Sequence, residues 1–414
     1  MKYFFILGNH PELSLAEIYS VLSDQAEYLS FAHGILIVET EILDAQNLIN
    51  NLGGTIKIGQ VLGQIKNIAT ESKDVLAEML QSAEKPLFGV SLYGAKYNFL
   101  PIALTLKKEL KINDRAPRFV VSREPVLSSV VVEQNKLTSG GLEAVFIKDN
   151  NSYWYGKTLA VQPFKDLSAR DYGRPSRDDA SGMLPPKLAR LMINLAVVDK
   201  QELLVDPFCG SGTILSEALL AGFQKIWGSD ISQKAIGDAQ NNLAWIGRRY
   251  NLDFDLLVET HCMRLPQDTR DACNASLRQQ VQLQVYDAAK LSSIVKPNSV
   301  GAVVTEPYLG PQQAGKLEPK AAAKNLENLY SETLKQLARI VCPGGRIVMA
   351  WPVFMAGSKS VYLNLNPENF GLHQVQNLLP TNLKYNQLQL TQRQTLLYGR
   401  QGQRVWREIV VLEK

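Results

Sequence analysis

Apolar positions follow two different periods along this chain, and the change from one to the other separates predicted strands from predicted helices. Short continuous apolar runs at 203–206, 225–230, 283–287 and 300–305 are typical of buried strands. Between the first two runs, apolar residues at 214–221 recur at helical spacing. The second half of the chain therefore alternates strands with helices, which predicts an α/β fold built on an open sheet.

The N-terminal part of the chain has a different order of elements. Strand-like and helical patterns over residues 1–65 follow the order β-α-β-β-α-β, which predicts a split βαβ, ferredoxin-like domain. Residues 66–165 predict a second α+β domain. The segment 166–185 is rich in Asp, Arg, Gly, Ser and Pro and is predicted to be a linker to a last domain at 186–414.

Composition narrows the class of protein only slightly. The chain has 414 residues, 45% of them hydrophobic, which is ample for two or three packed domains. A net charge of +4 permits an acidic partner such as RNA without requiring one. The 4 cysteines form no Cys-x-x-Cys pair and only 4 histidines are present, so no metal site is expected. No apolar run reaches the length of a signal sequence or a membrane span, so we expect a cytoplasmic protein without membrane contact.

The first apolar run of the α/β part leads into a glycine-rich turn. The run ends on Asp206, and Gly210 and Gly212 then let the backbone turn sharply and approach a ligand at the start of the next helix. An acidic acceptor beside helix N–H donors favours a ligand with ammonium or hydroxyl groups. The lysine of a phosphate loop and the third glycine of a dinucleotide fingerprint are absent. A purely structural strand-to-helix turn is the alternative.

Polar residues also follow the other three strand-like runs. Asp230 ends the second run, at about the distance where nucleotide-binding folds place a carboxylate on a ribose diol. Asp287-Ala288 ends the third run, and Glu306-Pro307-Tyr308 follows the fourth. Because open α/β sheets bind ligands at the carboxyl ends of their strands, these residues predict one shared site.

On these motifs the chain resembles the class I S-adenosylmethionine-dependent methyltransferases, which have a Rossmann-like, seven-stranded sheet ending in an antiparallel hairpin. The resemblance implies S-adenosylmethionine as cofactor. It places the methionine part on the glycine-rich turn, the ribose on the second acid, the adenine near the third acid and the target amine at the Pro-aromatic motif. The residues implied for the cofactor are Asp206, Phe208, Gly210, Ser211, Gly212, Thr213, Asp230, Ile231, Asp287 and Ala288.

The N-terminal half and the linker carry a closer resemblance. The stretch Asn9-His10-Pro11-Glu12-Leu13-Ser14 and the segments 170–175 and 184–190 are similar to those of THUMP-containing tRNA guanosine-N2 methyltransferases of the archaeal guanine-10 type. The resemblance implies that residues 66–165 are a THUMP RNA-binding domain, that tRNA is the partner and that guanosine 10 is the target. A small activating subunit is compatible with the sequence. The basic side chains of the C-terminal hairpin, Arg407 included, are interpreted as phosphate contacts or surface ion pairs. The expected substrate contacts are Tyr172, Arg174, Arg400, Arg404, Lys107 and Lys108.

The proposed catalytic motif departs from the family pattern. The usual sequence is Asp-Pro-Pro-Tyr or Asn-Pro-Pro-Tyr/Phe, whereas residues 305–310 read Thr-Glu-Pro-Tyr-Leu-Gly. One alignment puts Glu306 in the place of the acid, and the other puts Thr305 there. We prefer Glu306 because a carboxylate remains an acceptor for the amine. The Pro307 carbonyl is the second expected acceptor, and Tyr308 is expected to stack on the base.

Two other functions fit the same residues. A methyltransferase acting on ribosomal RNA or DNA would need the same cofactor site and a similar amine pocket. A catalytically silent module that binds S-adenosylmethionine and RNA is favoured by the unusual Glu306 motif. Analysis of modified nucleosides separates these alternatives from the tRNA enzyme.

Overall fold

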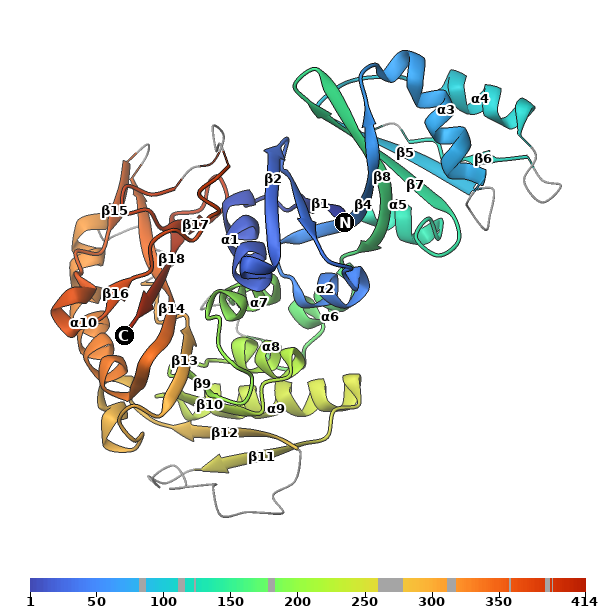
Figure 1. Cartoon of the computed structure of the whole chain (residues 1–414). Coiled ribbons are helices and arrows are strands. Elements are labelled where there is room, and N and C mark those ends of the chain that lie inside the picture. Colours follow the sequence, from blue (N-terminus) through green and yellow to red (C-terminus); the bar gives the residue numbers. More distant parts are fainter. Residues whose placement is uncertain are drawn as a thin grey trace. The chain divides into compact units, whose positions relative to one another are not determined.

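In the computed structural model the chain forms two compact units (Figure 1). Unit 1 comprises residues 1–15, 22–164 and 380–387, and unit 2 comprises residues 16–21, 165–379 and 388–414. The structure describes residues 1–81, 87–110, 116–122, 124–177, 183–259, 278–310, 318–356, 359–383, 388 and 390–414.

Unit 1 contains a single sheet with the strand order β2-β3-β1-β4-β8-β7-β5-β6. Its first four strands in sequence are antiparallel neighbours, and helices α1 and α2 connect them in the β-α-β-β-α-β order that the sequence predicts. The strands are β1 (Lys2–Leu7), β2 (Ala26–Ala32), β3 (Ile35–Thr40), β4 (Thr55–Ile65), β5 (Leu87–Tyr93), β6 (Arg118–Phe119), β7 (Leu142–Asp149) and β8 (Ser152–Val161). The helices are α1 (Pro11–Leu22), α2 (Ala45–Asn51), α3 (Ile68–Gln81), α4 (Leu100–Glu109) and α5 (Ser129–Gln134), with a 3-10 turn at Ser23–Gln25.

A buried polar cluster links strands from both N-terminal modules. Lys57 of β4 donates to the Glu143 carboxylate of β7 at 2.6 Å, and both side chains are almost fully buried. Ser91 and Thr158 also donate to Glu143, each at 2.6 Å. Since a buried charge must be paired and hydrogen-bonded, this cluster stabilises only the arrangement in which β4 and β7 share one sheet. The domain boundary predicted at residue 65 thus falls at the end of a strand inside a continuous sheet.

Unit 2 is built on a mainly parallel, Rossmann-like sheet. Its described strands number ten, in the order β11-β12-β10-β9-β13-β14-β18-β16, with β15 beside β14 and β17 beside β18. The neighbours from β11 to β14 are parallel, whereas β14 and β18 are antiparallel. The strands are β9 (Leu203–Asp206), β10 (Lys225–Asp230), β11 (Phe254–Glu259), β12 (Gln279–Val285), β13 (Val300–Thr305), β14 (Val341–Ala356), β15 (Lys359–Tyr362), β16 (His373–Gln374), β17 (Leu396–Tyr398) and β18 (Val405–Glu413).

The expected number of seven strands is therefore wrong for the described part of this sheet. The antiparallel C-terminal hairpin is present as β17 and β18. Of the additional strands, β11 pairs with β12, β15 pairs with β14, the strand directly before it, and β16 pairs with β18, which is distant in sequence. Such edge pairing depends on neighbours that the local sequence does not specify.

Helices cover the sheet of unit 2, and one of them lies in the predicted linker. Helix α6 (Phe164–Tyr172) includes the first residues of the predicted linker, and Arg170 is buried on its inner face. None of the helices in the described ranges is both long and apolar enough to cross a membrane. The other helices are α7 (Pro186–Leu195), α8 (Thr213–Ala221), α9 (Gln233–Tyr250) and α10 (Pro319–Ile340), with 3-10 turns at Ala288–Ser293 and Pro367–Phe370.

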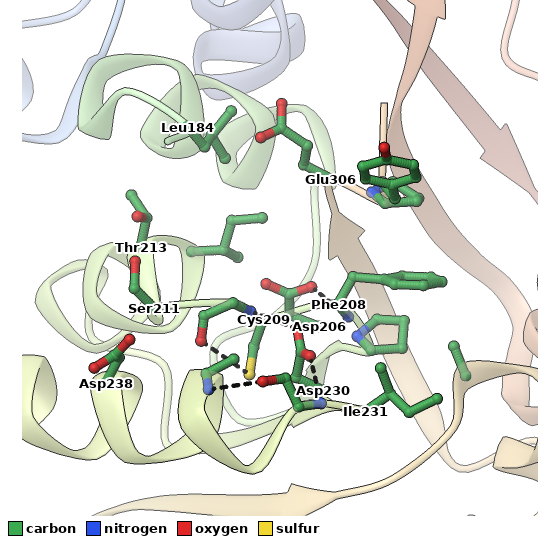
Figure 2. A pocket seen from close by; sticks show the side chains of 18 of the residues that line it. Leu184, Asp206, Phe208, Cys209, Ser211, Thr213, Asp230, Ile231, Asp238 and Glu306 are labelled. Atoms are coloured by element: carbon green, nitrogen blue, oxygen red, sulfur yellow. Dashed lines mark hydrogen bonds between the residues drawn. The ribbon is translucent and has the colours of Figure 1, made fainter. Parts of the chain in front are cut away.

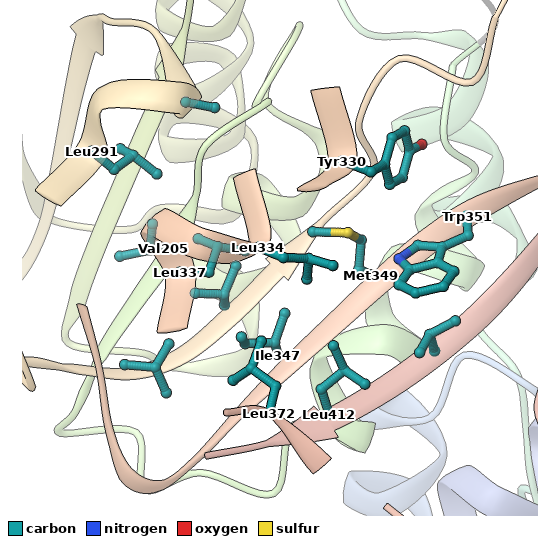
Figure 3. Packing of buried hydrophobic residues seen from close by; sticks show 14 of the residues in the cluster. Val205, Leu291, Tyr330, Leu334, Leu337, Ile347, Met349, Trp351, Leu372 and Leu412 are labelled. Atoms are coloured by element: carbon teal, nitrogen blue, oxygen red, sulfur yellow. The ribbon is translucent and has the colours of Figure 1, made fainter. Parts of the chain in front are cut away.

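The best-defined core of unit 2 lies between α10 and the strands β13, β14 and β18 (Figure 3). Tyr330, Leu334 and Leu337 follow one another at helical spacing and are completely buried. They pack with Met349 and Trp351 of β14. This packing fixes the end of β13, from which the candidate catalytic motif emerges.

Candidate active site

The carboxyl ends of β9, β10, β12 and β13 meet at a cavity of about 460 Å³ (Figure 2). Parallel strands that are neighbours in a sheet end at the same edge, so their terminal residues converge. The volume lies in the range of small-molecule sites, roughly 300–1,000 Å³. Of the residues predicted from the sequence, those that line the cavity are Asp206, Phe208, Gly210, Ser211, Thr213, Asp230, Ile231, Asp287, Ala288, Glu306, Pro307 and Tyr308.

Two of the cavity acids are oriented by backbone N–H groups close to them. Asp230 accepts from the N–H of Gly210 at 3.1 Å with one oxygen and from the N–H of Ser232 at 2.9 Å with the other. Asp287 accepts from the N–H of Ala289 at 3.0 Å and caps the 3-10 turn that follows β12. Both carboxylates therefore present fixed acceptors at strand ends, as a ligand with hydroxyl or amino groups requires.

Asp206 lies deeper and is almost fully buried. One of its oxygens accepts from the Thr305 hydroxyl at 2.7 Å and from the Phe208 N–H at 3.2 Å. Burial, the largest cause, and the charges of Asp230 and Glu306 together raise the pKa of Asp206 to about 7, although the hydrogen bonds from Thr305 and Phe208 act in the opposite direction. A cationic ligand in the cavity would stabilise the ionised carboxylate.

The two glycines of the turn have different surroundings. Gly210 lines the cavity and has φ +50°, and its N–H bonds Asp230. Gly212 caps α8 with φ +81° and does not line the cavity. A Cβ at Gly212 would lie 3.1 Å from the Ala239 Cβ on α9. Gly212 thus permits α8 and α9 to approach each other, whereas Gly210 permits the turn itself.

Glu306 forms an ion pair that the sequence reading missed. Its carboxylate accepts from the Nε of Arg407 in β18, and the two side chains are 12% and 10% exposed respectively. Arg407 is thus not an exposed phosphate contact. Glu306 lines the cavity, whereas Thr305 is fully buried and donates to Asp206. Of the two alignments, only the one that assigns the acid to Glu306 places that residue on the cavity wall.

The aromatic residue after Pro307 is available to a large planar ligand. The Tyr308 side chain is 56% exposed at the cavity, and its backbone carbonyl accepts from the Tyr330 hydroxyl at 3.3 Å. Burial, with the charge of Glu306, raises the pKa of Tyr330 well above its usual range, so this hydroxyl remains a donor. The backbone of the motif is therefore held by α10 while the Tyr308 ring faces outward.

Arg174, predicted as a substrate contact, is buried and contacts the end of the glycine-rich turn. It is 6% exposed and donates to the Thr213 hydroxyl at 2.5 Å. Nearby, Asn242 of α9 donates to the carbonyls of Ser211 at 2.8 Å and Ser176 at 2.9 Å. The segment before α7 is thus tied to the glycine-rich turn at two points, which the sequence suggested only through the family resemblance.

Glu217 of α8 anchors the same segment. It accepts from Arg170 of α6 at 2.5 Å and from Arg190 of α7 at 2.9 Å, and all three side chains are buried. Arg170 also donates to the Tyr250 hydroxyl at 3.1 Å. Charges this deeply buried are tolerated only when paired, so the triad specifies how α6 and α7 pack on α8.

The remaining predicted substrate contacts do not line the cavity. Tyr172 is 63% exposed, with the Arg177 guanidinium 5.6 Å from its ring centroid. Arg400 and Arg404 are exposed in the turn between β17 and β18, and Lys107 and Lys108 are exposed in the last turn of α4 in unit 1. Their assignment to a substrate remains a prediction.

Metal ligands and cysteines complete the inventory. The part of the chain that the structure describes contains no cluster of three or more His, Cys, Asp or Glu side chains that could hold a metal ion. Cys209 is buried in the wall of the cavity, and Cys342 is partly exposed. Cys262 and Cys273 lie outside the described residues.

Comparisons of the sequence with known proteins match part of the chain. Residues 174–362 match the family model described as UPF0020, the RMKL-like methyltransferase domain. The tRNA (guanine(10)-N2)-dimethyltransferase of Methanothermobacter thermautotrophicus is 30% identical over 174 residues, which are 42% of this chain and 40% of that protein. The protein of the same name from Methanocaldococcus jannaschii is 28% identical over 226 residues, 53% of this chain and 51% of that one. The matches thus span about half of these relatives or less.

A solved structure shows the same fold over a greater length. The crystal structure of TrmN from Thermus thermophilus aligns with 100% of this chain and 100% of its own, with a TM-score of 0.51 and 16% sequence identity. Both sheets of this chain, the N-terminal α+β sheet and the Rossmann-like sheet, are therefore part of a shared architecture.

Proposed function

We propose that this chain, which carries an S-adenosylmethionine-dependent methyltransferase domain of the RMKL-like family, methylates the exocyclic N2 amine of a guanosine in tRNA. The observation that carries the proposal is Glu306-Pro307-Tyr308 on the wall of the cavity that holds Asp206 and Asp230. An acceptor beside an exposed aromatic ring suits a planar base with an amino group. The names of the two archaeal relatives support guanosine N2, position 10 and tRNA.

The residues of the cavity fit the cofactor. S-adenosylmethionine supplies an electrophilic methyl group on a sulfonium when bound. Its ribose diol and its ammonium group need acceptors, which Asp230 and Asp206 provide at fixed positions. Asp287 and Ala288 lie at the end of the next strand, where the adenine is expected. The turn at Gly210 allows the backbone close to the ligand.

The chain's own contribution to the chemistry is positioning. A guanine amine is conjugated with its ring, so its lone pair must be directed at the methyl carbon. Glu306 and the Pro307 carbonyl would accept from the two N–H groups and favour that geometry. Tyr308 would stack on the base after it leaves its helix. As the N–C bond formed and the bond between sulfur and the methyl carbon broke, leaving its electron pair on sulfur, the amine would become acidic and Glu306 or water would accept its proton.

Unit 1 is proposed to supply RNA affinity. We propose a ferredoxin-like domain at 1–65, a THUMP RNA-binding domain at 66–165, a linker at 166–185 and the methyltransferase domain at 186–414, and the β-α-β-β-α-β order of β1 to β4 supports the first of these. Lys107 and Lys108 at the end of α4 would contact phosphates. Arg400 and Arg404 would do so from the methyltransferase domain, and Tyr172 from the linker.

The function is tested by nucleoside mass spectrometry. Purified protein and labelled cofactor are incubated separately with unmodified tRNA, ribosomal RNA and DNA, and the products are digested and identified. We expect N2-methylguanosine from tRNA alone, mapped to position 10 by fragment analysis. Label in ribosomal RNA or DNA would support the second enzyme function, and cofactor binding without transfer would support a silent module or a missing activating subunit. Adding cell extract that lacks this protein separates the last two outcomes.

A further inference from the structure

Arg407 reaches the catalytic motif from a distant part of the chain. It lies on β18, opposite Pro352 of β14, and β14 in turn pairs with β13, which leads to Glu306. The two residues of the ion pair are 101 positions apart in sequence. Arg407 is 8% exposed, so its charge is withdrawn from water and depends on Glu306 for compensation.

The groups around the pair are mostly acidic or neutral. Glu306 and Asp206 lie close enough for the charge of Glu306 to raise the pKa of Asp206. Tyr330 of α10 lies on another side, with its own pKa raised by burial and by Glu306. Tyr398 of β17 lies near Arg407. Arg407 is the cation that directly contacts Glu306 in these surroundings.

The ion pair still leaves Glu306 able to accept further hydrogen bonds. Arg407 engages Oε1, and a carboxylate offers about four lone-pair positions in total. A carboxylate fixed at one oxygen has little rotational freedom left, so its other oxygen has a defined direction at the cavity wall. Figure 2 shows Asp206 between Glu306 and Asp230, so Glu306 lies at the opposite end of the cavity from Asp230, the acid proposed to bind the ribose.

We propose that Arg407 is a positioning residue for methyl transfer, which pairs with Glu306 and holds its carboxylate toward the target amine. The proposal rests on the proposed function, because it assumes that Glu306 accepts from that amine. It also accounts for the departure of this motif from the usual acid. Glu is one methylene longer than Asp, and that length carries the carboxylate to the guanidinium of β18.

The test is a set of variants that removes either side of the ion pair, replaces the arginine conservatively, or removes both sides. Single-turnover methylation of tRNA is measured at saturating cofactor for wild type, Arg407→Gln, Arg407→Lys, Glu306→Gln and the double variant Arg407→Gln/Glu306→Gln. We expect Arg407→Gln to lower the rate constant about ten- to hundredfold. The loss should fall on this rate constant and not on cofactor affinity. Arg407→Lys should retain most of the activity.

The double variant should be no slower than Glu306→Gln, because Arg407 acts through Glu306. Cofactor affinity should change less than twofold throughout. Arg346→Gln is the matched control. Arg346 of β14 forms an ion pair with Glu413 of β18, the strand that also carries Arg407, but this pair lies away from the cavity. The control variant should leave the rate constant unchanged.

Several outcomes would overturn the inference. They are a wild-type rate in Arg407→Gln, no rescue of activity by Arg407→Lys, or multiplying losses in the double variant. If Arg407→Gln does not fold, the double variant, which leaves no unpaired charge, is compared with Glu306→Gln, and a further loss of rate would contradict the inference. A double-mutant cycle in thermal unfolding examines the pair without activity, and additive shifts would contradict the contact itself. If wild type makes no N2-methylguanosine, the proposed function fails first, and the unfolding cycle still decides whether the pair exists.

Discussion

The two ends of the cavity are built by different means. At the cofactor end, Asp230 and Asp287 are held by N–H groups of their own or neighbouring turns. At the end that we propose for the target amine, Glu306 is held by Arg407, a side chain from a strand on the other side of β14. Local capping needs only a strand, a turn and a short polar side chain. The amine end needs the whole C-terminal half of the sheet to be in register before its acid is oriented.

The largest effect is expected at the amine end. Glu306→Ala removes the proposed acceptor, and we expect methylation to fall about a hundredfold or more, with Glu306→Gln in between. Glu306→Asp should be slower than wild type, because the shorter side chain loses Arg407. Thr305→Val should mainly weaken cofactor binding, since Thr305 contacts Asp206. Single-turnover rates of these four variants decide the matter, and a fast Glu306→Ala would remove Glu306 from the mechanism.

A substitution at the cofactor end should lower the affinity for cofactor and leave the rate constant of methyl transfer almost unchanged. Asp230→Ala removes the acceptor for the ribose diol and the partner of the Gly210 N–H, so we expect cofactor binding to weaken by about 1–3 kcal/mol. The rate constant at saturating cofactor should change little. Calorimetry provides the measurement, with the exposed Asp253→Ala as the control. Unchanged affinity in Asp230→Ala would contradict the assignment of this acid.

The protonation of Asp206, which lies between the two ends, is expected to make the stability of the protein depend on pH. Its pKa is about 7 in the folded protein, mainly through burial, against an ordinary value of 3.8. The folded state therefore holds this proton more tightly, and the resulting stability is complete below about pH 4 and is lost as the pH rises through about 7. Without cofactor, Asp206→Asn should flatten this decline, since Asn can keep the oxygen that accepts from Phe208 and Thr305.

Cofactor binding gives an independent measure of the same proton. A cation near Asp206 favours the carboxylate, so binding at pH 7 should release roughly half a proton in wild type and none from this site in Asp206→Asn. Calorimetry in two buffers with different ionisation enthalpies measures the release. Equal release by both proteins would show that Asp206 does not face the cationic part of the cofactor.

The smallest effect is expected away from the cavity. Lys107→Ala/Lys108→Ala should weaken tRNA binding a few-fold and reduce the slope of log affinity against log salt by up to about two, because each phosphate contact releases a counterion. Cofactor affinity should stay the same. Filter binding at several salt concentrations tests this, with the exposed Lys335→Ala as control. An unchanged salt slope would mean that α4 does not contact the RNA.

Much of the fold was predictable because its signals are local. The apolar runs ending at Asp206, Asp230 and Thr305 correspond to β9, β10 and β13, and the helical pattern at 214–221 corresponds to α8. Helix α6 was not predicted, since its polar sequence becomes helical through burial of Leu167 and Arg170. Arg174 was assigned to the substrate for the same reason: a charged residue in a polar segment appears exposed until its buried partner is known.

The sequence alone determined the order of elements and the convergence of four strand-end motifs on one site, because strand direction and sheet edge follow from a period that is written locally. It also determined that Glu306 departs from the family's usual acid. Only the tertiary structure decided which neighbour each charge has. Arg407 forms an ion pair with Glu306, and Glu217 forms ion pairs with Arg170 and Arg190. These pairs form because strands and helices far apart in the chain pack together, and pairing across that distance depends on the register of the whole sheet.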